Sequence, residues 1–245
     1  MREETEFRPK PMVEVGGKPV LWHVMKTYAQ SGIKEFVICA GYKGNVIKNY
    51  FYNYAPENLD FTVRLGQKDE IVYHGSHDEF DWTVTVVDTG PATMTGGRIR
   101  RIRKFLGEEP FLCTYGDGIA NVDVAESLAF HREQGKIATM TTTRPTSRFG
   151  VVDMDATGAV EKFREKPRVE DWINVGYFVF EPGIFEYLDD DSTVLEESPL
   201  HRLAEEKQIS AFRHEGFWQP MDTQREAQQL NAIWDTGAAP WKTWA

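Results

Sequence analysis

The chain of 245 residues has only two cysteines and no long hydrophobic run. Cys39 and Cys113 each lie in a short apolar segment, and neither forms a zinc-binding pattern with the six histidines. No stretch approaches the roughly 18 consecutive apolar residues of a membrane span. Residues 1–10 are charged and lack the apolar segment of a signal peptide. We therefore expect two buried thiols, no membrane association and a cytoplasmic location.

The sequence also has fewer basic residues than acidic ones. The 28 lysines and arginines are outnumbered by 38 aspartates and glutamates, so the formal net charge is −10. This balance argues against non-specific binding to nucleic acid, which needs a positive surface. It leaves room for a local cluster of basic residues that binds phosphate. With 41% hydrophobic and 27% charged residues, the composition is that of an ordinary globular protein.

Helical and strand patterns alternate through the first half of the chain. Apolar residues at helical spacing follow Pro19, and short apolar or β-branched runs at 35–40, 82–88 and 111–115 predict strands. Such alternation favours an α/β fold with a mostly parallel, twisted sheet and helices on both faces. The second half is richer in predicted strands. We expect the two halves to share one continuous sheet within a single domain.

Two aspartates are candidate site residues. Asp117 follows a predicted buried strand and stands between Gly116 and Gly118, at the sheet edge where ligands bind in open α/β folds. Asp222 precedes a helix predicted over 223–234. Magnesium bound with a nucleotide usually takes one or two carboxylates plus phosphate oxygens. The residues alone leave open that Asp117 only shapes its turn and that Asp222 only caps the helix.

Basic residues in stiff or glycine-rich segments are candidates for phosphate contacts. Lys10 lies between Pro9 and Pro11, which restrict the backbone and so fix where the ammonium points. Lys166 follows a predicted strand. The segment 95–98 opens a predicted helix, where free N–H groups favour an anion. Each of these is also compatible with an ordinary surface position. The histidines on predicted helices have no partner at metal-ligand spacing.

A set of short motifs runs along almost the whole chain, at 9–15, 16–19, 21–23, 41–44, 87–90, 94–98, 114–118, 148–150, 165–167, 216–223 and 239–244. In these motifs and their order the sequence resembles the sugar-phosphate nucleotidyltransferase family, and within it the glucose-1-phosphate cytidylyltransferases. The resemblance implies a Rossmann-like nucleotide-binding fold. It also implies a reaction of CTP with glucose 1-phosphate that gives CDP-glucose and pyrophosphate.

The resemblance further implies how the chain is divided. We expect one nucleotidyltransferase domain over residues 1–245. Its nucleotide-binding half would span 1–145, and a β-rich half that binds the sugar phosphate would span 146–245. The implied cofactor is Mg²⁺ and the implied partners are CTP and glucose 1-phosphate, with no nucleic acid and no membrane. We also expect a homo-oligomer.

Site residues carry over from the family motifs position by position. By this match Asp117 and Asp222 would hold Mg²⁺, and Lys10 would contact the nucleotide phosphates; these three are the implied catalytic residues. Thr93, Arg98 and Gly116 fall where the family contacts the nucleotide, together with Lys10. Glu165 and Lys166 fall where related enzymes hold the sugar phosphate.

The chain departs from the family pattern at its start. The family begins with a strand and a Gly-Gly-x-Gly-Thr-Arg phosphate loop, and Met1 stands about where that loop has already ended. A chain without the loop would lack backbone N–H donors for the triphosphate. Two alternatives stay open: a sugar-1-phosphate nucleotidyltransferase that uses dTTP or UTP, and a non-catalytic homologue that binds sugar nucleotides. The segment 66–81 and the neighbourhood of 94–98 favour the cytidylyl branch.

Overall fold

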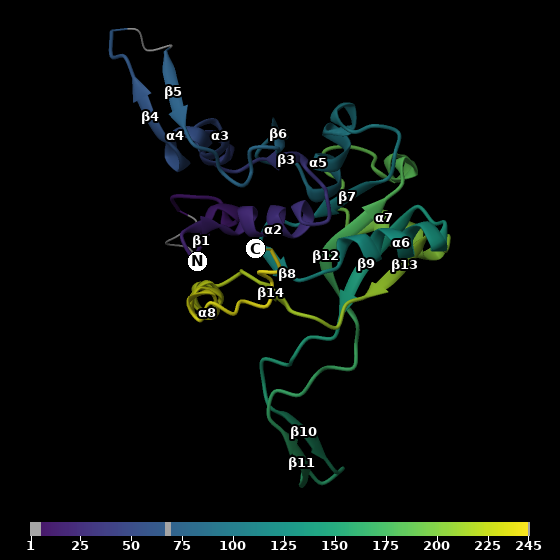
Figure 1. Ribbon diagram of the computed structural model, residues 1–245. Helices are drawn as coiled ribbons and strands as arrows, with labels where there is room; N and C mark the ends of the chain where they lie inside the picture. Colours follow the sequence, from purple (N-terminus) through teal and green to yellow (C-terminus); the bar gives the residue numbers. More distant parts are fainter. Residues whose placement is uncertain (1–5, 67–69, 245) are drawn as a thin grey trace.

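The structure, a computed structural model, describes residues 6–66 and 70–244 and is an α/β fold built around a four-stranded sheet (Figure 1). In spatial order the strands are β13 (Ile209–Arg213), β9 (Ala138–Thr143), β12 (Ile173–Phe180) and β7 (Phe111–Thr114). Strands β13 and β9 run parallel, whereas β12 is antiparallel to both β9 and β7. Because β7 and β9 precede residue 145 and β12 and β13 follow it, the two halves of the chain share this sheet.

A separate parallel pair of strands lies beside the main sheet. Strands β3 (Glu35–Ala40) and β6 (Thr83–Asp88) pair along their full length, and helix α3 (Gly44–Tyr52) packs on them through Ile47. The expectation that the two halves share a sheet is confirmed, but the expectation that this sheet is continuous through all the strands is wrong. Within the described residues β3 pairs only with β6, and β7 pairs only with β12. To join the two sheets, a further strand would have to pair with an edge of each, and no described segment does so.

Helices begin and end at residues that the sequence marks as caps. Helix α2 (Val20–Ala29) follows Pro19, whose fixed φ suits a helix start. Helix α6 (Val124–Gln134) is capped by Asp123 and ends at Gly135, which has a left-handed φ of +57°. The other helical segments are η1 (Lys10–Met12), α4 (Tyr54–Asn58), α5 (Thr95–Arg101), η2 (Arg103–Phe105), η3 (Pro182–Tyr187), α7 (Ser198–Glu205) and α8 (Gln224–Asp235).

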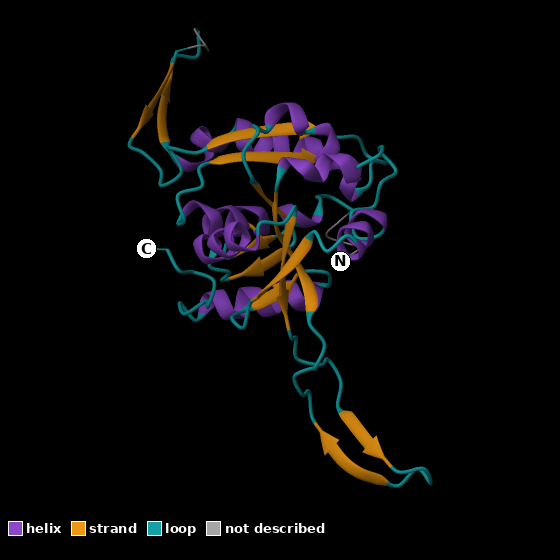
Figure 2. Ribbon diagram, turned by 90° about the vertical axis from the view of Figure 1, so that its right-hand side faces the viewer, coloured by secondary structure: helices purple, strands orange, loops and turns teal. Residues whose placement is uncertain are grey.

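Two antiparallel hairpins project from opposite ends of the molecule (Figure 2). One consists of β4 (Asp60–Val63) and β5 (Ile71–His74). The other, the β10–β11 arm, consists of β10 (Val151–Met154) and β11 (Val160–Arg164), and every residue of β11 is exposed. Two short ladders complete the described strands: β1 (Glu14–Val15) with β2 (Lys18–Pro19), and β8 (Gly118–Ala120) with β14 (Trp218–Pro220).

The main core joins both ends of the sequence around helix α2. Val20 of α2, Leu230 of α8 and Trp241 belong to one buried cluster. His23 of α2 is fully buried and lies edge-on to the rings of Trp234 and Trp241. Its Nε2 lies 2.8 Å from the Val15 carbonyl oxygen, and its Nδ1 lies 3.3 Å from the Trp241 indole nitrogen. A neutral ring with its proton on Nε2 satisfies both contacts.

The α/β class and the order of predicted elements are confirmed. The strands predicted at 35–40, 82–88 and 111–115 are β3, β6 and β7. The segment 66–81 contains β5. Its residues 67–69, like residues 1–5 of the charged start, lie outside the described residues. No helix in the described part of the chain combines the length and the apolar character that crossing a bilayer requires.

Acid should weaken the core through His23. Burial lowers the pKa of His23 to about 4 from an ordinary value of 6.5, because the charged ring would lose its hydration. The unfolded chain therefore takes up this proton at higher pH than the folded chain does. Stability is lost as the pH falls from 6.5 towards 4, by up to about 3 kcal/mol at the acidic end.

Thermal unfolding at a series of pH values between about 7 and 4 measures this loss. The Tm of the unaltered protein should fall more steeply than that of His23→Gln, which has no such proton to bind. His201→Gln is the matched control because His201 is exposed, and its curve should follow the unaltered protein. Parallel curves for all three proteins would show that His23 does not govern the acid response.

Candidate functional site

The ladder between β8 and β14 brings together two segments that are far apart in the sequence. Gly118 pairs with Pro220, and the Met221 N–H donates to the Asp117 carbonyl oxygen at 2.8 Å. Ile119 and Met221 are fully buried beneath the ladder. Asp117, just before β8, and Asp222, just after β14, therefore lie side by side at the same end of this antiparallel pair.

Lys10 lies between the two carboxylates. Its Nζ is 2.7 Å from Asp222 Oδ1 and 3.8 Å from Asp117 Oδ2. The hydrogen bond that Lys10 donates to the Asp222 carboxylate raises the pKa of Lys10. Burial raises the pKa of Asp117, against the opposing effect of the Lys10 charge. We refer to Lys10, Asp117 and Asp222 as the carboxylate–lysine cluster; with both carboxylates ionised it carries one negative charge in excess.

The backbone around Lys10 is rigid and closely packed. The segment η1 is closed by the Met12 N–H, which donates to the Pro9 carbonyl oxygen at 2.9 Å, and the Met12 side chain is buried. Pro11 packs against the turn that carries Asp117. A Cβ placed on Gly116 would lie 3.0 Å from Pro11 Cγ, which is closer than nearly all real contacts, so glycine allows this approach. The sequence prediction that the prolines fix the lysine agrees with this geometry.

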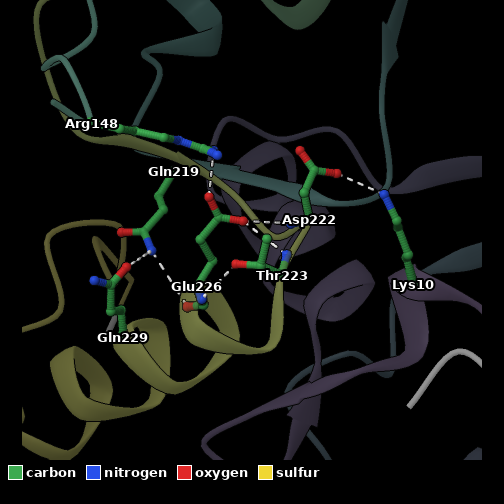
Figure 3. A network of polar contacts seen from close by, with 7 residues as sticks. All are labelled: Lys10, Arg148, Gln219, Asp222, Thr223, Glu226 and Gln229. Atoms are coloured by element: carbon green, nitrogen blue, oxygen red, sulfur yellow. Dashed lines mark hydrogen bonds and ion pairs between the residues drawn. The ribbon is translucent and has the colours of Figure 1, made fainter. Parts of the chain in front are cut away.

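Thr223, rather than Asp222, caps helix α8 (Figure 3). The Thr223 hydroxyl accepts the Glu226 N–H at 3.2 Å, and the Glu226 carboxylate accepts the Thr223 N–H at 2.9 Å. This reciprocal pair is a capping box. The alternative that Asp222 is the helix cap is therefore excluded, and its carboxylate is turned to Lys10.

The same two carboxylates are chemically suited to Mg²⁺. Among the residues that the structure describes, no group of three or more His, Cys, Asp and Glu side chains is arranged to hold a metal ion. Two carboxylates are nevertheless enough for Mg²⁺ that arrives with a polyphosphate, because phosphate oxygens and water complete its shell. Asp117 and Asp222 already share one cation, the Lys10 ammonium. The residues present therefore fit a magnesium site of this kind.

Arg98 and Thr93 lie near the carboxyl ends of β3 and β6. Thr89 follows β6 and its N–H and hydroxyl both donate to the Ala40 carbonyl oxygen, at 2.8 and 2.9 Å. Arg98 Nη1 donates to the Thr89 hydroxyl at 2.6 Å, and Thr93 is buried. This is the sheet edge at which open α/β folds bind ligands. No hydrogen bond or ion pair in the described chain joins Arg98 to the carboxylate–lysine cluster.

Glu165 and Lys166 lie at the base of the β10–β11 arm, directly after β11. Lys166 Nζ is 3.7 Å from Glu165 Oε1, and both side chains are more than half exposed. Lys166 has a φ of +44°, in the left-handed region that residues other than glycine rarely adopt. Between the described residues there is no direct polar contact from this pair to the carboxylate–lysine cluster.

Two residues beside Asp222 were not predicted as site residues. Glu226 could have been found from the spacing Thr223-x-x-Glu226, which is a capping-box pattern in the sequence. Arg148 belongs to a motif of the family resemblance, but nothing in the sequence shows what it contacts. In the structure its Nη2 lies 2.5 Å from Glu226 Oε1.

Known proteins resemble this chain along its whole length. The chain is 48% identical to a glucose-1-phosphate cytidylyltransferase from Salmonella typhi, over 100% of this chain and 95% of that protein. It is 38% identical to a Bacillus subtilis protein named "Probable glucose-1-phosphate cytidylyltransferase", again over 100% of this chain and 95% of the relative.

The fold has counterparts among solved structures. HddC from Yersinia pseudotuberculosis, in complex with GMP-PN, superimposes with a TM-score of 0.65 over 92% of this chain and 90% of that chain. At 18% identity this similarity concerns the fold alone. The sequence pattern of the nucleotidyl transferase family matches residues 4–223, a span that includes Lys10, Asp117 and Asp222. Since this match takes in most of the chain, and relatives are similar throughout their length, the chain belongs to the nucleotidyl transferase family.

Proposed function

We propose that this protein is a glucose-1-phosphate cytidylyltransferase, which transfers CMP from CTP to α-D-glucose 1-phosphate and releases pyrophosphate. The observation that carries the proposal is the 48% identity to the Salmonella typhi enzyme over the entire chain. The carboxylate–lysine cluster supports it, because a lysine and two carboxylates at one sheet edge suit phosphoryl chemistry.

The reaction requires positioning and charge neutralisation more than covalent catalysis. A phosphate oxygen of the sugar attacks the α-phosphorus of CTP, and the bond from that phosphorus to the leaving pyrophosphate breaks in line with the attack. Lys10 is the residue that we assign to the nucleotide phosphates. Its side chain is 40% exposed, so the ammonium can move from Asp222 to a phosphate oxygen. Asp117 and Asp222 would hold Mg²⁺, which neutralises phosphate charge when bound.

The remaining site residues are assigned to the two substrates. Thr93, Arg98 and Gly116 would bind the nucleotide within the half that spans 1–145. Glu165 and Lys166 would bind glucose 1-phosphate within the half that spans 146–245. Their high exposure leaves both side chains able to turn towards a ligand. We further propose a homo-oligomer in the cytoplasm as the working form.

Replacing Asp117 by asparagine tests the cluster directly. Asp117→Asn keeps the volume of the side chain but removes a charge from the cation site, so turnover should fall by at least about 100-fold. Because burial already raises the pKa of Asp117, the neutral side chain should leave the Tm nearly unchanged. Initial rates at several Mg²⁺ concentrations and a thermal unfolding curve measure the two effects.

The matched control is Asp155→Asn, which neutralises an exposed carboxylate in the turn of the β10–β11 arm. Its rate and its magnesium dependence should equal those of the unaltered protein. If Asp117→Asn also retained both, Asp117 would be a turn residue and the assignment of the cation site would be wrong.

The choice of nucleotide is tested by offering CTP, UTP and dTTP separately with glucose 1-phosphate and Mg²⁺. Chromatography of the sugar nucleotides should show CDP-glucose formed at least about tenfold faster than the UDP or dTDP product. Faster formation of either other product would overturn the cytidylyl assignment and keep the reaction class. Nucleotide binding without turnover of any of the three would instead identify a non-catalytic homologue.

A further inference from the structure

The Glu226 carboxylate is shared between the backbone of Asp222 and the side chain of Arg148 (Figure 3). One oxygen, Oε2, accepts the N–H groups of Asp222 and Thr223, both at 2.9 Å. The other, Oε1, accepts from Arg148 Nη2 at 2.5 Å. The Glu226 side chain is only 12% exposed, whereas that of Arg148 is 65% exposed, so the ion pair lies at the border with solvent.

The contact with Asp222 is more than the helix needs. A capping box requires only the exchange between Thr223 and Glu226. The additional hydrogen bond holds the peptide plane that precedes the Asp222 Cα, and so limits the directions in which this carboxylate can point. The Met221 N–H donates to the Asp117 backbone carbonyl oxygen at 2.8 Å. Hydrogen bonds therefore fix two successive backbone N–H groups, those of Met221 and Asp222.

Arg148 connects the same carboxylate to the base of the β10–β11 arm. It lies two residues before Gly150, and a Cβ placed on Gly150 would lie 3.2 Å from Glu165 Oε2. The segment that carries Arg148 therefore packs beside Glu165, the neighbour of Lys166. Direct contacts thus join Arg148 to Glu226 and Glu226 to Asp222, and two residues of backbone connect Arg148 to Gly150 beside Glu165.

We propose that Glu226 is a positioning residue for Asp222, and that the Arg148–Glu226 ion pair couples the base of the β10–β11 arm to the carboxylate–lysine cluster. Glu226 fixes the aspartate, and Arg148 uses the same carboxylate to hold Glu165 and Lys166 in place for glucose 1-phosphate. The roles of the Glu165–Lys166 pair and of the carboxylate–lysine cluster rest on the proposed function. The coupling through Arg148 and Glu226 rests on the structure alone.

Two substitutions of Glu226 separate its two tasks. Glu226→Gln can still accept the backbone N–H groups, since glutamine also serves at this position of a capping box, but it cannot pair ionically with Arg148. Glu226→Ala removes both contacts. Arg148→Ala breaks the ion pair from the other side, and the double variant Arg148→Ala/Glu226→Gln completes a double-mutant cycle.

Steady-state kinetics should show a selective effect on the sugar phosphate. We expect Arg148→Ala and Glu226→Gln each to raise the KM for glucose 1-phosphate on the order of fivefold, with kcat and the KM for CTP changed less than about twofold. The double variant should be no worse than either single variant. Glu226→Ala should in addition raise the Mg²⁺ concentration for half-maximal rate on the order of tenfold.

Hydrogen exchange of the full chain tests the link without reference to activity. In Glu226→Gln, a change on helix α8, the amides of residues 146–150 should exchange faster, on the order of fivefold. In Glu226→Ala the amides of Asp222 and Thr223 should also lose protection. Lys162→Ala, which removes a positive charge further out on the arm, is the control for charge and should match the unaltered protein in both measurements.

The outcomes separate the inference from the proposed function. Failure of the unaltered protein to make CDP-glucose would contradict the proposed function, whereas unchanged exchange at 146–150 in Glu226→Gln would contradict the coupling. Additive effects of the two single variants on the KM for glucose 1-phosphate would also overturn it. A lower Tm and kcat with both KM values and the magnesium dependence unchanged would make Glu226 a helix cap and nothing more.

Discussion

The candidate site depends on the three-residue ladder between β8 and β14. This pairing sets Asp117 and Asp222 next to each other at one end of the ladder. The fully buried side chains of Ile119 and Met221 stabilise the ladder. Tyr177 of the main sheet donates its hydroxyl to the Gly118 carbonyl oxygen at 3.0 Å, and Trp218 donates its indole N–H to the Val175 carbonyl oxygen at 3.2 Å. These two hydrogen bonds attach the ladder to β12, so the main sheet determines where both aspartates lie.

Electrostatics then determine what the site attracts. Two carboxylates held together repel each other, and the structure relieves this by placing one ammonium between them. A second cation is still favoured, since one negative charge remains. The chain is also acidic overall, with a net charge of −10, so the field of the whole molecule does not attract a phosphate to this site.

Much of this architecture was predictable from the sequence because its elements are periodic and end in recognisable caps. Strand β3 and helix α6 are examples, since β-branched or apolar runs and the Asp123 and Gly135 caps mark them. Asp117 and Asp222 were found through motifs. The ladder that joins them was not, because strands of three residues have no measurable alternation. The contact between Arg148 and Glu226 also escaped prediction, as it depends on where an exposed arm meets a helix 78 positions away. The break between the β3–β6 pair and the main sheet is likewise a property of the spatial arrangement, which local pattern does not encode.

The packing of Trp241 against helix α2 has a consequence for how the protein is made. Trp241 is fully buried and bonds to His23 across 218 positions of sequence, so the hydrophobic centre around α2 stays open until residue 241 is available. Contacts of such long range are slow to form, because the chain loses the entropy of closing a large loop before the contacts contribute any stabilising free energy. Until residue 241 has been synthesised, the earlier segments would therefore have secondary structure but an incomplete interior. In the cell, that interval exposes α2 and its apolar neighbours to chaperones and to aggregation until the last aromatic residues dock.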